Sequence, residues 1–112
     1  MSTLYKSNFF NLTTTADTAV YTCPADTETI VKNIQVHNYG GSNVVFESCV
    51  NRDGVDYDIT HLTLSGKDSR NALSGVLVLE EGDTLKVNAA TANFISGAVS
   101  YVEVRSDTKN PI

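Results

Sequence analysis

The chain has 112 residues, with 13 acidic and 8 basic side chains and a formal net charge of −5. This length suits one domain with a single core. The basic residues are scattered singly, so the sequence offers no positive patch to a nucleic acid or an anionic membrane. No apolar run approaches the roughly 20 residues that span a bilayer, and residues 1–6 lack the layout of a secretion signal. We expect a protein that stays in a reducing cytosol and has neither nucleic-acid nor membrane partners.

The residue types favour an all-β protein. The chain contains 13 valines, 13 threonines and 5 isoleucines, and these β-branched residues suit pleated sheets and crowd helices. Short runs rich in them alternate with glycine, aspartate and asparagine turns from Val20 almost to Arg105. No interval of ten residues has helical periodicity, so the pattern predicts strands joined by turns.

The N-terminal region, residues 1–18, is predicted to be an arm or an edge strand. Phe9 and Phe10 are adjacent, and strand alternation sends adjacent side chains to opposite faces. Residues 19–23 form the next predicted strand, which ends at Pro24 because proline cannot donate to a β-ladder. Residues 29–38 make the clearest strand of the chain.

Turn signals connect the following strands. Gly40 and Gly41 can adopt the positive φ of a tight reversal, so we expect residues 30–37 and 44–50 to form an antiparallel hairpin. The sequence Asn51-Arg52-Asp53-Gly54 marks a second turn, before a strand at 55–64 with a bulge near His61.

The last third of the chain repeats this pattern. Residues 65–71 are polar and predict an exposed loop. Residues 75–79 and 84–90 predict a second hairpin-like return, and residues 94–105 the last strand of a domain that spans 19–105. We expect the tail, residues 106–112, to be frayed.

About eight strands at this spacing predict an antiparallel β-sandwich, jelly-roll-like, made of two packed sheets. The apolar residues that alternate along the strands are the candidate core. They are Ile34, Val36, Val44, Phe46, Ile59, Leu62, Val78, Leu85, Val87, Val102 and Val104.

No motif predicts a catalytic, metal or cofactor site. His37 and His61 lie within strands, and no Gly-x-Ser-x-Gly elbow presents a nucleophile. Asp53, Asp56 and Asp58 follow Asn51 but do not match a calcium loop, so a solvated acidic loop is the favoured interpretation. Cys23 and Cys49 are expected to be buried free thiols, with a disulfide as the minority alternative.

One composite stretch resembles a known family. Its first segment is residues 19–38, which contain Tyr21, Pro24-Ala25 and Ile30-Val31-Lys32. Its second segment is the later sequence Leu79-Glu80-Glu81-Gly82-Asp83-Thr84-Leu85. These two segments of the chain resemble small tailed-phage virion proteins. The resemblance covers residues 19–105. It implies a jelly-roll or related sandwich that assembles, commonly as a trimer, on the capsid surface or on the neck or tail. It brings no catalytic residue, and its pattern requires neither cysteine.

We therefore expect a non-enzymatic virion structural protein, in particular a capsid decoration or cement protein that binds the major capsid protein as an oligomer. A neck, tail or fibre component is the close alternative. A carbohydrate-binding module is the alternative from another class, with Tyr57 beside acidic residues as its best evidence. The predicted interface residues are Phe9, Phe10, Leu12, Tyr39 and Tyr57.

Overall fold

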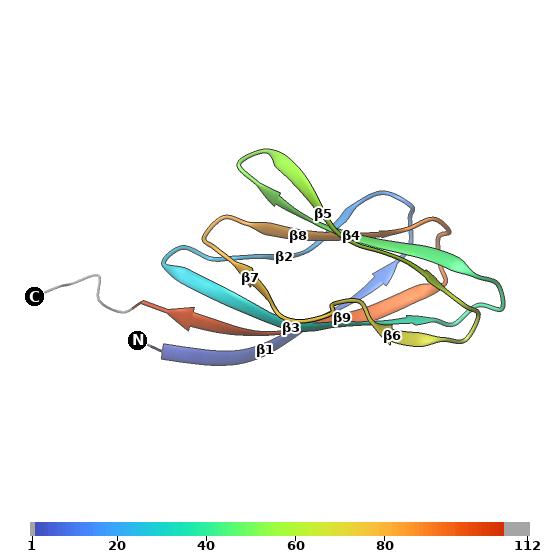
Figure 1. The fold of residues 1–112 in the computed structure, drawn as a ribbon, viewed down its shortest axis with the longest axis horizontal. Coiled ribbons are helices and arrows are strands. Elements are labelled where there is room, and N and C mark those ends of the chain that lie inside the picture. The colour runs from blue at the N-terminus through green and yellow to red at the C-terminus, as the bar shows by residue number, and fades with distance from the viewer. Residues whose placement is uncertain (1, 107–112) are drawn as a thin grey trace, which may run out of the picture.

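The computed structural model describes residues 2–106, which form nine strands and no helix (Figure 1). The strands are β1 (Ser2–Leu12), β2 (Thr18–Thr22), β3 (Thr27–Asn38), β4 (Val44–Arg52), β5 (Val55–Leu64), β6 (Ser69–Asn71), β7 (Leu77–Leu79), β8 (Thr84–Ala89) and β9 (Ile95–Arg105). The all-β prediction is confirmed, and the short β6 lies within the segment predicted to be an exposed loop. A membrane-crossing helix is absent from the described residues.

The strands form two sheets that lie one above the other in Figure 1. The first sheet has the order β1-β9-β3-β6, and β7 pairs with another part of β3. The second sheet has the order β2-β8-β4-β5. All the pairings are antiparallel, so the predicted antiparallel sandwich is confirmed, and the arrangement is compatible with a jelly roll.

β1 and β9 form the longest unbroken pairing of the molecule. They run antiparallel in one register, from Ser2 opposite Arg105 to Leu12 opposite Ile95. β1 is thereby the outer strand of the first sheet. The predicted tail 106–112 lies outside the described residues except for Ser106.

The predicted hairpin between residues 30–37 and 44–50 is wrong. β3 pairs with β6, β7 and β9, whereas β4 pairs with β5 and β8. The turn after Asn38 therefore carries the chain from the first sheet to the second. Gly40 does not have positive φ, but a Cβ there would lie 2.7 Å from the ring of Phe94, so the turn requires glycine for space.

The predicted return between residues 75–79 and 84–90 is wrong for the same reason. β7 pairs with β3 in the first sheet, and β8 pairs with β2 and β4 in the second. A short polar connection between two strands therefore marks a change of sheet here and not a hairpin.

β4 and β5 do form a hairpin. The φ angles of Asp53 and Gly54 are 54° and 82°, and two successive positive φ values are typical of the type I′ turn that suits strand twist. The register shifts where Ser48 pairs with Thr60 and Cys49 pairs with Asp58. The extra residue is Ile59, so the bulge lies two residues before His61, near which it was predicted.

The core lies between the two sheets. Its largest fully buried side chains include Phe46, Leu12, Ile34, Leu64, Leu79, Leu85 and Ile95. Two of the predicted core residues are exposed, Ile59 at 39% and Val78 at 52%. Both lie on outermost strands, which have a neighbouring strand on one side only.

The close contact at Gly97 of β9 gives a test of the packing. A Cβ at this position would collide with the carbonyl oxygen of Gln35 and lie 2.6 Å from Cζ of Phe10, whereas a Cβ at Gly75 would meet nothing within 4 Å. Because backbone cannot yield cheaply, we expect Gly97→Ala to lower the free energy of unfolding by about 1–3 kcal/mol.

Urea unfolding monitored by circular dichroism measures this difference, with Gly75→Ala as the matched control. We expect the control to change stability by less than about 0.5 kcal/mol. Equal stability of the two variants would contradict the packing described for Gly97.

Candidate interaction surface

The large apolar side chains that remain exposed gather in three places. Leu4, Tyr5 and Phe9 lie on β1, and Tyr39 and Phe94 lie together at the turn after β3, with ring centroids 6.2 Å apart. The third group lies on β5, on β7 and just before β7, and consists of Tyr57, Ile59, Val76 and Val78, whereas Val55 lies beside the β4–β5 turn. We call this group the β5–β7 patch.

The outward face of the first sheet carries an apolar row. Tyr5 lies opposite Val102, Val102 opposite Ile30, and Ile30 opposite Val78, so the row crosses β1, β9, β3 and β7. Residues that lie opposite one another in a sheet share a face. Tyr5 is 83% exposed at the end of this row.

The outward residues of β1 and β9 carry no charge, although the chain is acidic. Alternation places them on the face opposite the core. They are Thr3, Tyr5, Ser7, Phe9 and Asn11 on β1, and Ser96, Ala98, Ser100, Val102 and Val104 on β9. Because depletion of charge is typical of the centres of protein interfaces, this face is suited to contact another protein.

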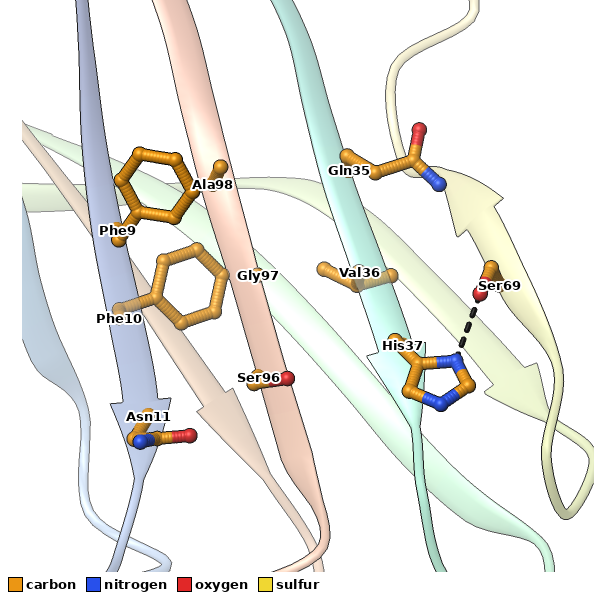
Figure 2. Close-up of a pocket in the computed structure, with 10 residues that line it drawn as sticks. All are labelled: Phe9, Phe10, Asn11, Gln35, Val36, His37, Ser69, Ser96, Gly97 and Ala98. Atoms are coloured by element: carbon orange, nitrogen blue, oxygen red, sulfur yellow. Dashed lines mark hydrogen bonds between the residues drawn. The ribbon is translucent and has the colours of Figure 1, made fainter.

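A shallow groove of about 580 Å³ lies over small residues of β9 (Figure 2). Ser96, Gly97 and Ala98 lie between the two phenylalanines of β1 and residues of β3. His37 lies across from them, with its Nδ1 2.7 Å from Oγ of Ser69. The groove is wide and open, with the aromatic ring of Phe9 at its border.

A second groove, of about 350 Å³, opens at the opposite edge of the sandwich. Its walls are mainly apolar and come from Val50, Tyr57, Ile59, Leu77, Val78 and Leu79. One end carries Arg52 and Asp83, joined by two hydrogen bonds of 2.8 and 2.6 Å from the guanidinium to the carboxylate. The Arg52 guanidinium holds the pKa of Asp83 below its usual range.

A buried carboxylate connects the two sheets. Glu103 of β9 is 2% exposed, and the hydroxyl of Tyr21 on β2 donates to it at 2.7 Å. Arg105 and Lys6 approach its other oxygen at 2.8 and 3.3 Å. Burial alone would raise the pKa of Glu103, but these three donors outweigh burial and lower it. The ionised Glu103 carboxylate is therefore part of the packing between the two sheets.

The remaining polar clusters are also explained by local pairing. Asp17, Cys49 and Asp56 bring potential metal-binding atoms within 4.8 Å of one another. The Lys86 ammonium lies 2.9 Å from Asp56 and 4.0 Å from Asp17, so the place of a cation is taken by a side chain. Burial raises the pKa of Cys49 and keeps its thiol protonated, which makes it a poor ligand.

The two histidines have separate local partners, and the two cysteines are free thiols. His61 contacts Glu47 at 2.8 Å, and His37 contacts Ser69, on different sheets. The expectation of buried free thiols is confirmed, since Cys23 and Cys49 are both buried and unpaired with each other.

The five residues predicted for an interface lie in different surroundings. Phe9 is 82% exposed, whereas Phe10 is half-buried against the core. Leu12 is fully buried within the core and is not available to a partner. Tyr39 and Tyr57 are exposed at the turn after β3 and in the β5–β7 patch. Sequence reasoning missed Val76 and placed Val78 in the core, because the exposure of these residues depends on which face of a strand is covered.

The similarity of this chain to known proteins lies in its fold and not in its sequence. No family model matches, and no curated protein matches by sequence. The chain is similar to a chain in the acid-stable capsid structure of Helicobacter pylori bacteriophage KHP30, with a TM-score of 0.59, 12% identity, and coverage of 92% of this chain and 87% of that one.

Two further solved structures share the fold. One is the T13 particle of infectious bursal disease virus, with a TM-score of 0.57 and 8% identity over 92% of this chain but 31% of that one. The other is the core of Drosophila NLP, described for pentamer formation and histone binding, with a TM-score of 0.52 and 10% identity over 87% and 96%. Identities this low establish the sandwich fold alone.

The buried Glu103 gives a pH-dependent prediction. Since its pKa is lower in the folded chain than in the unfolded chain, its contribution to stability is present above the unfolded value near 4.5 and is lost as the pH falls through the folded value. We expect Glu103→Gln to lower the free energy of unfolding at pH 7 by about 1–3 kcal/mol and to weaken the loss of stability below about pH 4.5.

Urea unfolding between neutral and acidic pH measures both effects. Glu28→Gln, which changes an exposed glutamate of β3, is the matched control and should follow the wild type. Asp83 has a lowered pKa as well, so part of the acid sensitivity should persist in the variant. A Glu103→Gln protein with the wild-type pH profile would contradict the role given to this carboxylate.

Proposed function

We propose that the chain is a non-enzymatic virion structural protein, and specifically a decoration or cement protein that binds the outer surface of a phage capsid as a homo-oligomer. The observation that carries this proposal is the likeness to a chain of a bacteriophage capsid structure over nearly the whole length of both chains. The tailed-phage pattern in residues 19–38 and 79–85 supports the same class of protein.

The β5–β7 patch is the surface that we assign to the capsid. It is apolar, lies at the edge of the sandwich opposite β1, and includes a groove that can accept apolar side chains of a partner. The affinity of such a small surface is modest, and several copies joined together would increase it by avidity. The resemblance favours a trimer as the assembled unit.

The position on the particle distinguishes two versions of this proposal. A neck, tail or fibre component would use the same scaffold and the same kinds of contact. It is the alternative if the protein purifies with tails and not with heads.

The carbohydrate-binding alternative is less well supported by the geometry around Tyr57. The neighbours of its ring in the groove are aliphatic, and Arg52 and Asp83 there bond to each other. Asp56 already accepts hydrogen bonds from Asn51 and Lys86. A sugar needs several free polar groups around the aromatic face, and this groove offers few.

Purified particles of the phage that carries the gene provide the test. We expect mass spectrometry to find the chain in intact heads, and recombinant protein to rebind to heads stripped of it with saturable stoichiometry. Recovery only in the soluble lysate would contradict a virion role, and recovery only with tails would replace the capsid proposal with the tail alternative.

A charge variant tests the assigned surface. We expect Val76→Asp combined with Val78→Asp to weaken rebinding to stripped heads by at least about 10-fold, because two carboxylates in an apolar contact would lose hydration without partners. Thr13→Asp combined with Thr15→Asp adds the same charge to the exposed loop after β1 and is the matched control. Rebinding weakened equally by both pairs would contradict the assignment to the β5–β7 patch.

A further inference from the structure

β1 is the one long strand edge in residues 2–106 that has neither a bulge nor a proline. It pairs with β9 alone, through eleven residues without a register shift. It contains no proline. Its single charged residue, Lys6, points inward, a position that can itself discourage strand pairing, but Glu103 at 3.3 Å offsets the charge. Natural edge strands are normally shortened, bulged or charged, because free backbone N–H and C=O groups attract other strands.

The other edges of the described sheets do have such features. β2 is five residues long and its register shifts between Ala19 and Tyr21. β5 contains a bulge together with Asp56 and Asp58. β6 and β7 are three residues each. Among the described edge strands β1 is therefore the least protected, with one inward lysine as its only such feature.

The sequence of β1 is complementary to itself. Two copies that run antiparallel with Ser7 opposite Ser7 overlap along all eleven residues, from Ser2 opposite Leu12 to Leu12 opposite Ser2. In this register Tyr5 of each copy lies opposite Phe9 of the other. Both residues are on the outward face and more than four-fifths exposed in the single chain, and cross-strand aromatic pairs stabilise sheets.

Neighbouring registers are worse. A shift by one residue would place outward side chains of one copy opposite inward side chains of the other. A register centred on Lys6 would set the two ammonium groups opposite each other, and like charges in this position destabilise a sheet. A register centred on Asn8 would set Lys6 opposite Phe10. The fully overlapping register alone forms both aromatic pairs, and it sets each Lys6 opposite Asn8 of the other copy and not opposite the other Lys6.

We propose that β1 is a self-association site, at which a second copy of this chain pairs its own β1 antiparallel across a twofold axis at Ser7. The two first sheets then form one continuous sheet. The contact suits an acidic chain, because β1 has no acidic residue and the outward residues of β9 beside it are uncharged. The inference concerns the isolated protein and does not rest on the proposed function.

Pairing through β1 doubles the number of chains in the oligomer that the other contacts form. Pairing through β1 alone gives a dimer, and pairing between trimers gives a hexamer with twofold and threefold axes. In either case, a variant that blocks pairing through β1 should therefore form an oligomer of half the mass of the wild-type oligomer.

Charge reversal across the predicted register provides the main test. The like-charge variant, Tyr5→Glu combined with Phe9→Glu, places two carboxylates opposite each other twice. The opposite-charge variant, Tyr5→Glu combined with Phe9→Lys, places a carboxylate opposite an ammonium group twice. We expect sedimentation to show that the like-charge variant halves the particle mass and weakens association at least about 10-fold, and that the opposite-charge variant restores association. Because both positions are exposed, both variants should keep the wild-type circular dichroism spectrum.

Three outcomes would overturn the proposal. In the first, the wild-type protein is monomeric at concentrations up to about 100 µM. In the second, the like-charge variant has the same mass as the wild-type protein. In the third, the opposite-charge variant dissociates as fully as the like-charge variant. None of these measurements involves a phage particle, so their failure is distinguishable from failure of the virion role.

Cross-linking tests the twofold axis separately. We expect Ser7→Cys chains to be joined in pairs by a short bismaleimide, because residues opposite each other in an antiparallel pair have Cβ atoms about 5 Å apart. Thr63→Cys, an exposed position on β5, is the matched control, and wild-type chains control for the buried Cys23 and Cys49. Equal cross-linking of the two variants would contradict the assigned axis.

Discussion

The structure depends on the two-sided pairing of β9. This strand pairs with β1 along its whole length on one side and with β3 on the other. Its alternation sends Ile95, Val99 and Tyr101 into the core. The intervening residues form an uncharged outer face. The alternation of β9 thus places one set of its side chains in the core and the other set on the outer face of the first sheet.

The same pairing explains why a buried charge is tolerated. Glu103 lies on the inward side of β9, where Tyr21 donates to it from the second sheet and Lys6 and Arg105 approach it from the first. Burial and the neighbouring carboxylate raise the pKa of Tyr21, so its hydroxyl remains a donor. The Tyr21 hydrogen bond fixes the position of one sheet over the other, because sliding would break the one of these three contacts that comes from the second sheet.

The strands could be predicted from the sequence, but their partners could not. Period-two alternation located β2 to β5, β8 and β9, since it reflects one buried face of each strand. The turn after β3 resembles a hairpin turn, yet the buried amide of Asn38 donates to the carbonyls of Leu64 and Ser65 and ties this turn to the end of β5. That contact joins distant residues, so no local pattern could indicate it.

The candidate surface was predictable to a similar extent. Adjacent Phe9 and Phe10 were expected on opposite faces, and the structure turns Phe9 outward and Phe10 against Gly97. Ile59 and Val78 were assigned to the core because alternation does not distinguish a covered face from an exposed one at the edge of a sheet. An arm or edge strand was expected at residues 1–18, but the length of the free edge of β1 emerges only from the topology of the described strands, in which β1 pairs with β9 alone.

In the proposed assembly the sandwich makes contacts at two edges. β1 pairs with a second copy of the chain, and the β5–β7 patch contacts the capsid. Cryo-electron microscopy of the phage particle tests this claim most directly. We expect density for the chain on the head, with β1 strands of neighbouring copies paired around Ser7 and the β5–β7 patch against the capsid. Copies that contact the shell through the outward face of β9 and leave β1 unpaired would contradict the account.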